Sequence, residues 1–401
     1  MVRNFVGSMA IPIAIALCLW ASVPFCMAAQ QDRSSAKQDS GVFIRWLGKD
    51  TIAIQRFVIK SDSVFTKILF IPRGLTISEG SGTLFPDGSI KSMHSKVFTV
   101  SSKGTLQLTQ ESHLTSSPDS TWISVTRDRQ TSQRSYFGRC FVTNDADITS
   151  FHVFPFWGLY APQKVNDSVT GYQFSSGKNR DYTIKRSGAQ SLRVGGSLMG
   201  YLTLVLDGKN RLDSMNGVGS TQNWIAKIHR TMNFDSIVSV QILRQQRSGV
   251  EPPLSIRDTV KFTKGNLSLS INYWRPSARG RKIFGEVVPY NRFWRVGANN
   301  ATEIQTTEAL YFGDKRLESG KYSVFILPTL EGWTMMFNKK TGIWGTDYDA
   351  SHGILRVPMT VMTPQNYTEQ LSVSVAPSVK GGTIYVDWER TRGVLPFEVK
   401  E

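Results

Sequence analysis

Short runs of alternating apolar and polar residues, separated by turn residues, fill this chain from residue 41 onward. Residues 267–273 (LSLSINY) alternate strictly, which is typical of an antiparallel strand with one covered face. Hairpins are predicted around Gly48-Lys49-Asp50 and around the Asp-Gly pairs within residues 83–90 and 201–209. Because a helical period is almost absent, the pattern predicts an all-β fold.

The chain has 401 residues, more than one ordinary β domain needs, so two domains are expected. Residues 247–253 (RSGVEPP) combine a glycine with two prolines and give the strongest linker signal in the sequence. We therefore predict an N-terminal β domain at 41–247, a linker at 248–256 and a C-terminal domain at 257–401. The first is expected to be a curved antiparallel sheet with little helix, and the second a β-sandwich or jelly-roll-like domain.

One helix is predicted near the end of the N-terminal domain. Asp235 is a suitable N-cap, and Ile237, Val238 and Ile242 recur on one helical face. The rest of that domain is expected to be sheet.

The first 29 residues have the layout of a secretory signal. Arg3 gives a positive start, residues 11–25 are mostly apolar, and small residues follow. The apolar run is short for a membrane span, which needs about 20 residues. We predict a signal peptide at 1–29, a flexible leader at 30–40 and export to the periplasm or the cell exterior, with no membrane span after cleavage. An uncleaved anchor is the alternative.

The cysteine positions indicate that the mature protein has no disulfide bond to stabilise it. Signal cleavage would remove Cys18 and Cys26 and leave Cys140 as the last cysteine, so no intramolecular disulfide can form. Cys140 lies in an apolar stretch and is expected to be a small buried side chain rather than a nucleophile. Stability must then come from core burial.

Several sequence motifs follow one another in the C-terminal half. They are RPSARGRKIFG (275–285), WRVGANNAT (294–302), LESGKYS (317–323), IWGT (343–346) and VDWERT (386–391). Over about residues 257–399, this region resembles the domain-of-unknown-function family 2911 of exported bacterial proteins, with Asn300 where the family more often has an acidic residue. The resemblance implies a β-sandwich-like domain and no established reaction.

The most polar of these motifs supply a candidate ligand site. Arginine suits bidentate binding of planar anions, and a tryptophan face can stack on a sugar ring. The candidate ligand-binding residues are Arg281, Lys282, Trp294, Arg295, Asn299, Thr302 and Glu303. The alternative is that Arg295 and Asn299 satisfy backbone groups in an irregular connection. The ligand would be a small molecule or a carbohydrate.

Motifs for metal, cofactor and nucleophile chemistry are missing from the sequence. The five histidines, His94, His113, His152, His229 and His352, form no short metal-ligand pair and no His-Glu-x-x-His motif, so no metal or cofactor is predicted. No Gly-x-Ser-x-Gly elbow marks a serine hydrolase. The formal net charge of +16 is scattered and belongs to no nucleic-acid module, so no nucleic-acid partner is predicted.

These features favour an exported cell-envelope protein that binds or scaffolds without catalysis, and two alternatives stay open. A hydrolase acting on envelope carbohydrates or esters needs two carboxylates, or a serine with a histidine, in one cleft. A lipid or acyl-chain carrier needs an apolar concave face of the N-terminal sheet that is open to solvent.

Overall fold

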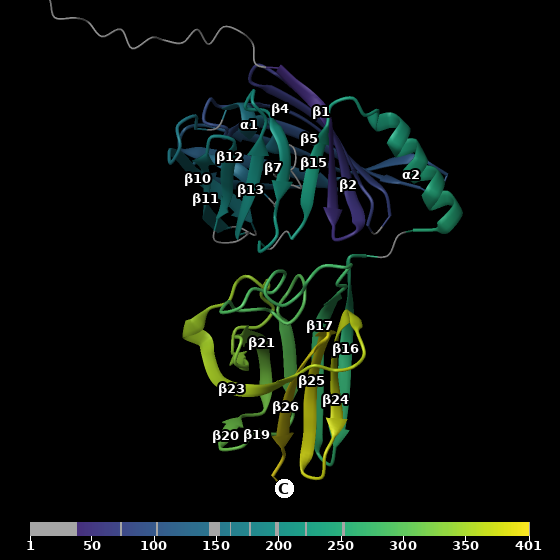
Figure 1. The fold of residues 1–401 in the computed structure, drawn as a ribbon, viewed down its shortest axis with the longest axis vertical. Coiled ribbons are helices and arrows are strands. Elements are labelled where there is room, and N and C mark those ends of the chain that lie inside the picture. The colour runs from purple at the N-terminus through teal and green to yellow at the C-terminus, as the bar shows by residue number, and fades with distance from the viewer. Residues whose placement is uncertain are drawn as a thin grey trace, which may run out of the picture. The chain divides into compact units, whose positions relative to one another are not determined.

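The computed structural model describes residues 38–400, apart from 73, 102, 144–152, 161, 176–177, 197–199, 221–222 and 251–252. The predicted signal peptide, most of the predicted leader and His152 lie outside the described residues. The described chain forms two large sheets, one in each half, which confirms the all-β prediction (Figure 1).

The N-terminal sheet has 15 strands, and two helices accompany it. The elements are β1 (Gln38–Leu47), β2 (Asp50–Lys60), β3 (Ser63–Phe70), β4 (Thr76–Leu84), β5 (Ile90–Val100), β6 (Leu106–Ser116), β7 (Ser120–Arg127), β8 (Gln130–Phe137), β9 (Cys140–Thr143), α1 (Phe154–Tyr160), β10 (Ser168–Ser175), β11 (Lys178–Gly188), β12 (Ser191–Gly196), β13 (Gly200–Leu206), β14 (Leu212–Asn216), β15 (Ile225–His229) and α2 (Phe234–Ser248). From β1 the sheet extends in two directions, through β2 to β8 on one side and through β15 back to β9 on the other. Neighbouring strands are antiparallel except β9 and β10.

The three predicted hairpins are confirmed by the strand register. Leu47 pairs with Asp50 between β1 and β2, and the Asp-Gly turns join β4 to β5 and β13 to β14. The first strand begins earlier than predicted, because Gln38 already pairs with Lys60 of β2. Residues 38–40, assigned to the leader from the sequence, therefore belong to the sheet.

The N-terminal sheet curls around α1, and its inner face forms a large apolar core with this helix. Tyr136 of β8 stacks on Phe174 of β10 with ring centroids 4.3 Å apart, although β8 and β10 lie near opposite ends of the strand order. Phe154, Phe156 and Trp157 of α1 are buried inside this curl, and Trp157 donates a hydrogen bond to the carbonyl of Gly88 at 3.2 Å. Gly88 has a φ of +87°, and a Cβ there would lie 3.0 Å from Trp157. Cys140 is buried in the same core, as predicted, and burial raises the pKa of its thiol.

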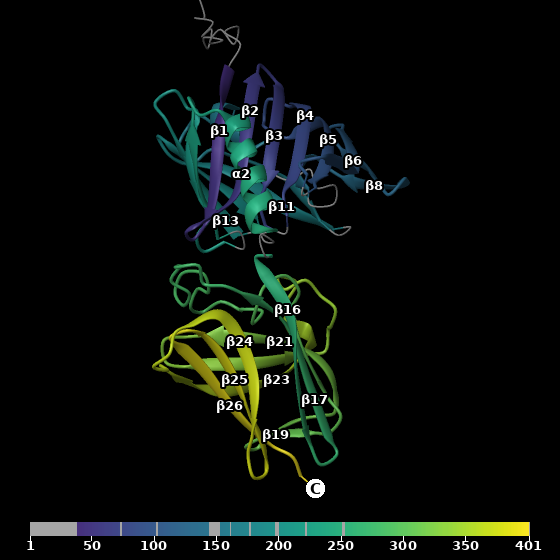
Figure 2. The same ribbon diagram turned by 90° about the vertical axis from the view of Figure 1, so that its right-hand side faces the viewer.

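The opposite face of strands β1 to β5 is partly covered by α2 (Figure 2). Val238 is buried against the sheet, and Ile237 and Ile242 pack beside it, which confirms the predicted apolar face. The predicted N-cap is wrong by two residues: Asn233 accepts a hydrogen bond from the amide of Ser236. An asparagine side chain before the first helical residue serves this role as well as an aspartate. No helix among the described residues combines the length and the apolarity that crossing a membrane requires.

The C-terminal sheet has 11 strands. The elements are β16 (Ser255–Lys264), β17 (Leu267–Pro276), β18 (Thr302–Thr306), β19 (Leu310–Phe312), β20 (Lys315–Leu317), β21 (Gly320–Pro328), β22 (Trp333–Asn338), the 3-10 helix η2 (Ala350–His352), β23 (Gly353–Met362), β24 (Thr368–Pro377), β25 (Gly381–Glu389) and β26 (Thr391–Glu398). Strand β23 pairs first with β22 and then, through residues 360–362, with β26, so the sheet turns a corner there. Strand β24 lies beside β16 and β17, and the layers enclose one apolar core. This arrangement fits the predicted sandwich-like fold.

Candidate functional site

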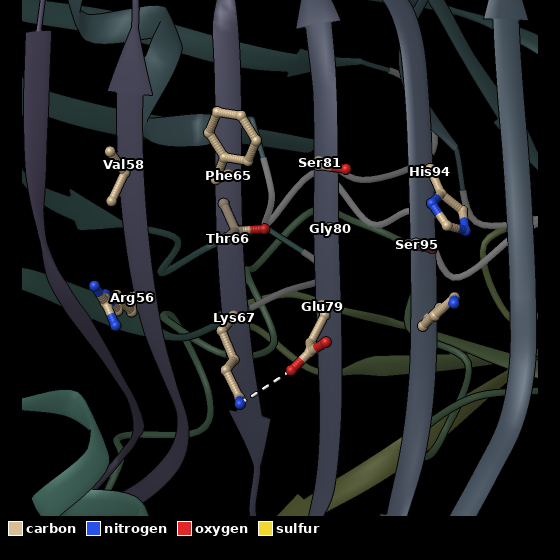
Figure 3. Close-up of a pocket in the computed structure, with 11 residues that line it drawn as sticks. Arg56, Val58, Phe65, Thr66, Lys67, Glu79, Gly80, Ser81, His94 and Ser95 are labelled. Carbon is tan, nitrogen blue, oxygen red and sulfur yellow. Dashed lines mark ion pairs between the residues drawn. The ribbon is translucent and has the colours of Figure 1, made fainter.

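A hollow of about 420 Å³ opens on the N-terminal sheet, over strands β2 to β5 (Figure 3). Its lining residues are Arg56, Val58, Phe65, Thr66, Lys67, Glu79, Gly80, Ser81, His94, Ser95 and Lys96. Arg56 and Glu79 lie two positions beyond Ile54 and Ile77, which pack in the apolar cluster under α2. Because side chains alternate along a strand, the hollow opens on the same face as α2.

Antiparallel register arranges the side chains of the hollow in two rows. The charged row crosses the strands in the order Arg56, Lys67, Glu79, Lys96 and Glu111, each paired with the next. Residues that face each other across antiparallel strands have side chains in contact range. The sheet therefore brings five charged residues from five strands into one line.

The second row runs beside the first and is less polar. It crosses the strands in the order Val58, Phe65, Ser81, His94 and His113, again each paired with the next. The side chain of Phe65 is half exposed. The hollow thus has an apolar part next to a charged part.

Cations outnumber carboxylates in the lining. Lys67 forms an ion pair with Glu79 at 3.0 Å, the carboxylate of the lining. Arg56 lies 3.9 Å from Asp235 of α2, and both side chains are largely exposed. Exposed pairs of this kind contribute little stability, so their charges remain available to a ligand.

Two histidines and a glutamate meet at the edge of the hollow. His94 Nε2 lies 2.7 Å from Glu111 Oε1, and His113 Nε2 lies 3.9 Å from the same oxygen. The two imidazole rings stack with centroids 4.3 Å apart. The hydrogen bond from His94, followed by the attraction of Lys96, holds the pKa of the Glu111 carboxyl below its usual value.

Of the seven C-terminal residues predicted to bind a ligand, Trp294 and Thr302 are buried, Lys282 is exposed and the other four are partly buried. Trp294 belongs to the core, where its ring centroid lies 5.7 Å from that of Phe284 and 6.0 Å from that of Trp388. Its backbone also exchanges two hydrogen bonds of 2.8 Å with Ile326. The faces of this ring are occupied by neighbouring aromatic side chains.

Both arginines are partly buried, and Arg281 bonds to the backbone of its own connection. Arg281 donates to the carbonyls of Ala278 and Ser277 at 2.9 and 2.8 Å, and burial lowers its pKa to about 10. Lys282 beside it is exposed. Burial also lowers the pKa of Arg295 to about 10, and its Nε atom has no hydrogen-bond partner among the described residues.

Close packing explains why position 345 of the IWGT motif is a glycine. A Cβ at this position would lie 1.9 Å from Cδ of Arg295 and 2.7 Å from the carbonyl oxygen of Asn299. The backbone amide of Gly345 donates to that same carbonyl at 2.9 Å. The WRVGANNAT and IWGT motifs are therefore packed against each other.

The remaining predicted residues also bond within the domain. Asn299 adopts a φ of +57° and donates to Ser255 Oγ at 3.2 Å, and the buried Thr302 hydroxyl donates to Val296 at 2.8 Å. Glu303 accepts from the amide of Gly342 at 2.7 Å and pairs with Lys321 at 2.9 Å. Glu303 also lines a second hollow of about 170 Å³, and it is the one carboxylate among the described residues of that lining.

No direct sequence signal marks the two rows on the N-terminal sheet. His94 and Glu111 are 17 positions apart, and each looks like an ordinary polar residue of a strand. Only the pairing of β5 with β6 brings them together. A prediction of register across that hairpin could have found them.

Comparison with known proteins is informative for the C-terminal half alone. No curated protein matches the chain. The C-terminal region, residues 255–397, matches the family model described as Protein of unknown function (DUF2911), which confirms the resemblance drawn from its motifs.

Proposed function

We propose that this chain is an exported, non-catalytic binding protein of the bacterial cell envelope, and that its N-terminal sheet holds a small organic anion in the hollow over β2 to β5. The observation that carries the proposal is the lining itself. Arg56, Lys67 and Lys96 supply positive charge, and Phe65 and Val58 supply apolar surface beside it. A ligand with an anionic group and an aromatic or apolar part matches both rows.

The chemistry of the hollow supports binding rather than reaction. Glu79 is the carboxylate of the described lining and is paired with Lys67. The hydroxyl group of Ser81, which lies in the same row as Phe65 and His94, can donate to an anion. Arginine and lysine together can hold an anion through charge-assisted hydrogen bonds.

The two alternative functions have less support from the described residues. A hydrolase would depend on Glu303, whose carboxylate is already bonded to Gly342 and Lys321. An acyl-chain carrier would depend on the inner face of the N-terminal sheet, where Phe154, Phe156 and Trp157 of α1 are buried. We therefore propose the hollow on the outer face as the binding site.

The binding proposal is testable with 8-anilino-1-naphthalenesulfonate, an aromatic sulfonate, as the probe. Calorimetric titration should show saturable binding at one site per chain. Replacing both Arg56 and Lys67 by glutamine should weaken binding at least tenfold, because charge-assisted hydrogen bonds contribute about 1.5–3 kcal/mol each. Lys91→Gln is the matched control, since this exposed lysine lies on β5 but outside the lining.

Two outcomes would overturn the binding proposal. One is an affinity that the double substitution leaves unchanged. The other is an equal loss in the Lys91→Gln variant, which would indicate a nonspecific charge effect. Phe65→Ala should separately weaken binding about fivefold through lost apolar contact.

Export is tested independently of the hollow. Expression of the complete chain in a Gram-negative host should give a mature protein that lacks the first 29 residues. Mass spectrometry of the protein released by osmotic shock measures both its N-terminus and its compartment. Recovery of the uncleaved chain in the cytoplasmic fraction would contradict export.

A further inference from the structure

The histidine and glutamate side chains at the edge of the hollow have the composition of a metal site. His94 of β5 faces His113 of β6 directly, and Glu111 lies two residues before His113 on the same strand. Because strand side chains alternate between faces, all three project from the same side of the sheet. Their position follows from the register of one hairpin, a rigid part of the fold.

The donor atoms are already close to the spacing that a metal ion requires. One ligand atom from each residue lies within 4.8 Å of the others. Tetrahedral coordination with bonds of 2.0–2.1 Å places donors about 3.3 Å apart. The separation of 3.9 Å between His113 Nε2 and Glu111 Oε1 needs only a small side-chain rotation to reach that spacing.

We propose that His94, Glu111 and His113 bind one divalent transition-metal ion of the zinc class. Two imidazoles and one carboxylate suit Zn²⁺, Cu²⁺ or Ni²⁺, whereas Mg²⁺ and Ca²⁺ prefer sites made of oxygen donors. The three side chains are 33–59% exposed, so an ion can enter from solvent and keep water at its open position. This site does not depend on whether the hollow holds an organic anion.

The positive charge of Lys96 disfavours metal binding, so its removal should raise the metal affinity, whereas the ligand substitutions lower it. Its ammonium group lies 3.5 Å from Glu111 Oε1 and would repel a bound dication. The lysine side chain is partly exposed and can turn away into solvent. Lys96→Met should therefore tighten metal binding by a factor of roughly 5–30, because a fixed ammonium about 4 Å from a dication costs about 2 kcal/mol in water and turning away lowers that cost.

The experiment is a calorimetric titration of the untagged chain with zinc chloride. We expect one ion per chain, and at least a tenfold loss of affinity in each of His94→Ala, Glu111→Gln and His113→Ala. His229→Ala is the control, because this histidine lies on β15 away from the cluster, and it should leave the affinity unchanged. Magnesium chloride at the same concentrations should give no saturable heat.

A second readout follows the metal itself. Co²⁺ in place of Zn²⁺ should give visible absorption typical of nitrogen and oxygen ligands, and His113→Ala should alter that spectrum. Zinc should also raise the melting temperature of the wild-type chain but not that of His113→Ala, because an ion that binds only the folded state stabilises it. The proposal fails if zinc does not bind at one ion per chain. It also fails if the three substitutions leave zinc binding unchanged, or if Lys96→Met weakens it.

Discussion

The connection over residues 275–302 and the two rows on the N-terminal sheet use polar side chains in opposite ways. In the connection, residues that are neighbours in sequence bond to nearby backbone: Arg281 reaches Ser277 and Ala278, and Thr302 reaches Val296. In the rows, residues up to dozens of positions apart line up across five strands and remain partly exposed. The conspicuous motif stabilises structure, whereas the inconspicuous residues form the open surface.

This difference has a simple physical cause. A strand inside a sheet satisfies its own backbone groups through the ladder, so its outward polar side chains are free to meet solvent or a ligand. An irregular connection has no ladder, and its buried carbonyl groups need donors from side chains. A dense polar motif in a connection therefore first indicates that nearby buried backbone groups need hydrogen-bond partners. A role in ligand binding is inferred only for polar side chains that those backbone groups do not occupy.

The largest expected effect comes from Trp294→Ala. Removing this side chain from among Phe284, Trp333 and Trp388 leaves a cavity and should lower the free energy of unfolding of the C-terminal domain by about 3–5 kcal/mol. Urea denaturation measures the loss. The affinity of the hollow for the aromatic sulfonate should stay unchanged. A variant with full stability and weakened binding would make Trp294 a ligand contact and would break the comparison.

Gly345→Ala should have a smaller effect of the same kind. The added Cβ would collide with Arg295 and with the carbonyl of Asn299, so one of the two motifs must shift. Overpacking of this sort costs about 1–3 kcal/mol. Thermal denaturation measures it, and Gly313→Ala reports the cost of losing a glycine where no atom lies within 4 Å of the new Cβ. Because Gly313 has a positive φ, alanine there loses stability through backbone strain rather than through a collision. Equal losses in the two variants would therefore not exclude a collision at Gly345, and a second variant is needed to check for it.

That check is the combination of Gly345→Ala with Arg295→Ala. Shortening Arg295 removes the Cδ atom that the new Cβ would meet, so the double variant should recover part of the loss. Additive losses would show that Arg295 and Gly345 do not press on each other. The motifs would then need an explanation other than mutual packing.

The fold was predictable where the signal is local. Alternation and turn residues identified the hairpins of β1 with β2, β4 with β5 and β13 with β14. Both the turn type and the strand period depend on residues that are close in sequence. Helix α1 was not predicted, since FPFWGLY is apolar on all sides and shows no 3.6-residue period. Its burial inside a curled sheet explains that composition.

The candidate site was not predictable in the same way. The sequence identified Trp294 and Arg281 because they stand in a dense motif, but the motif gives no information on which atoms face solvent. The rows of the hollow depend on long-range register, and a slip of one residue would send every side chain to the other face. A single sequence does not fix that register over five strands.

The smallest expected effect separates the rows from the core by their response to acid. The pKa of Glu111 is lowered in the folded chain, so its charged form stabilises folding above the ordinary carboxyl pKa of 4.5, and this contribution is lost as the pH falls through the lowered value. Glu111→Gln should reduce the free energy of unfolding at pH 7 by about 0.2–1 kcal/mol, the range for exposed pairs, and the difference from wild type should shrink as the pH falls below the ordinary carboxyl value of 4.5. Urea denaturation of both chains at each pH measures it. A difference that keeps growing below pH 4.5 would contradict a lowered pKa of Glu111. A difference as large as that of Trp294→Ala would mean that the row residues stabilise the fold as strongly as the core does.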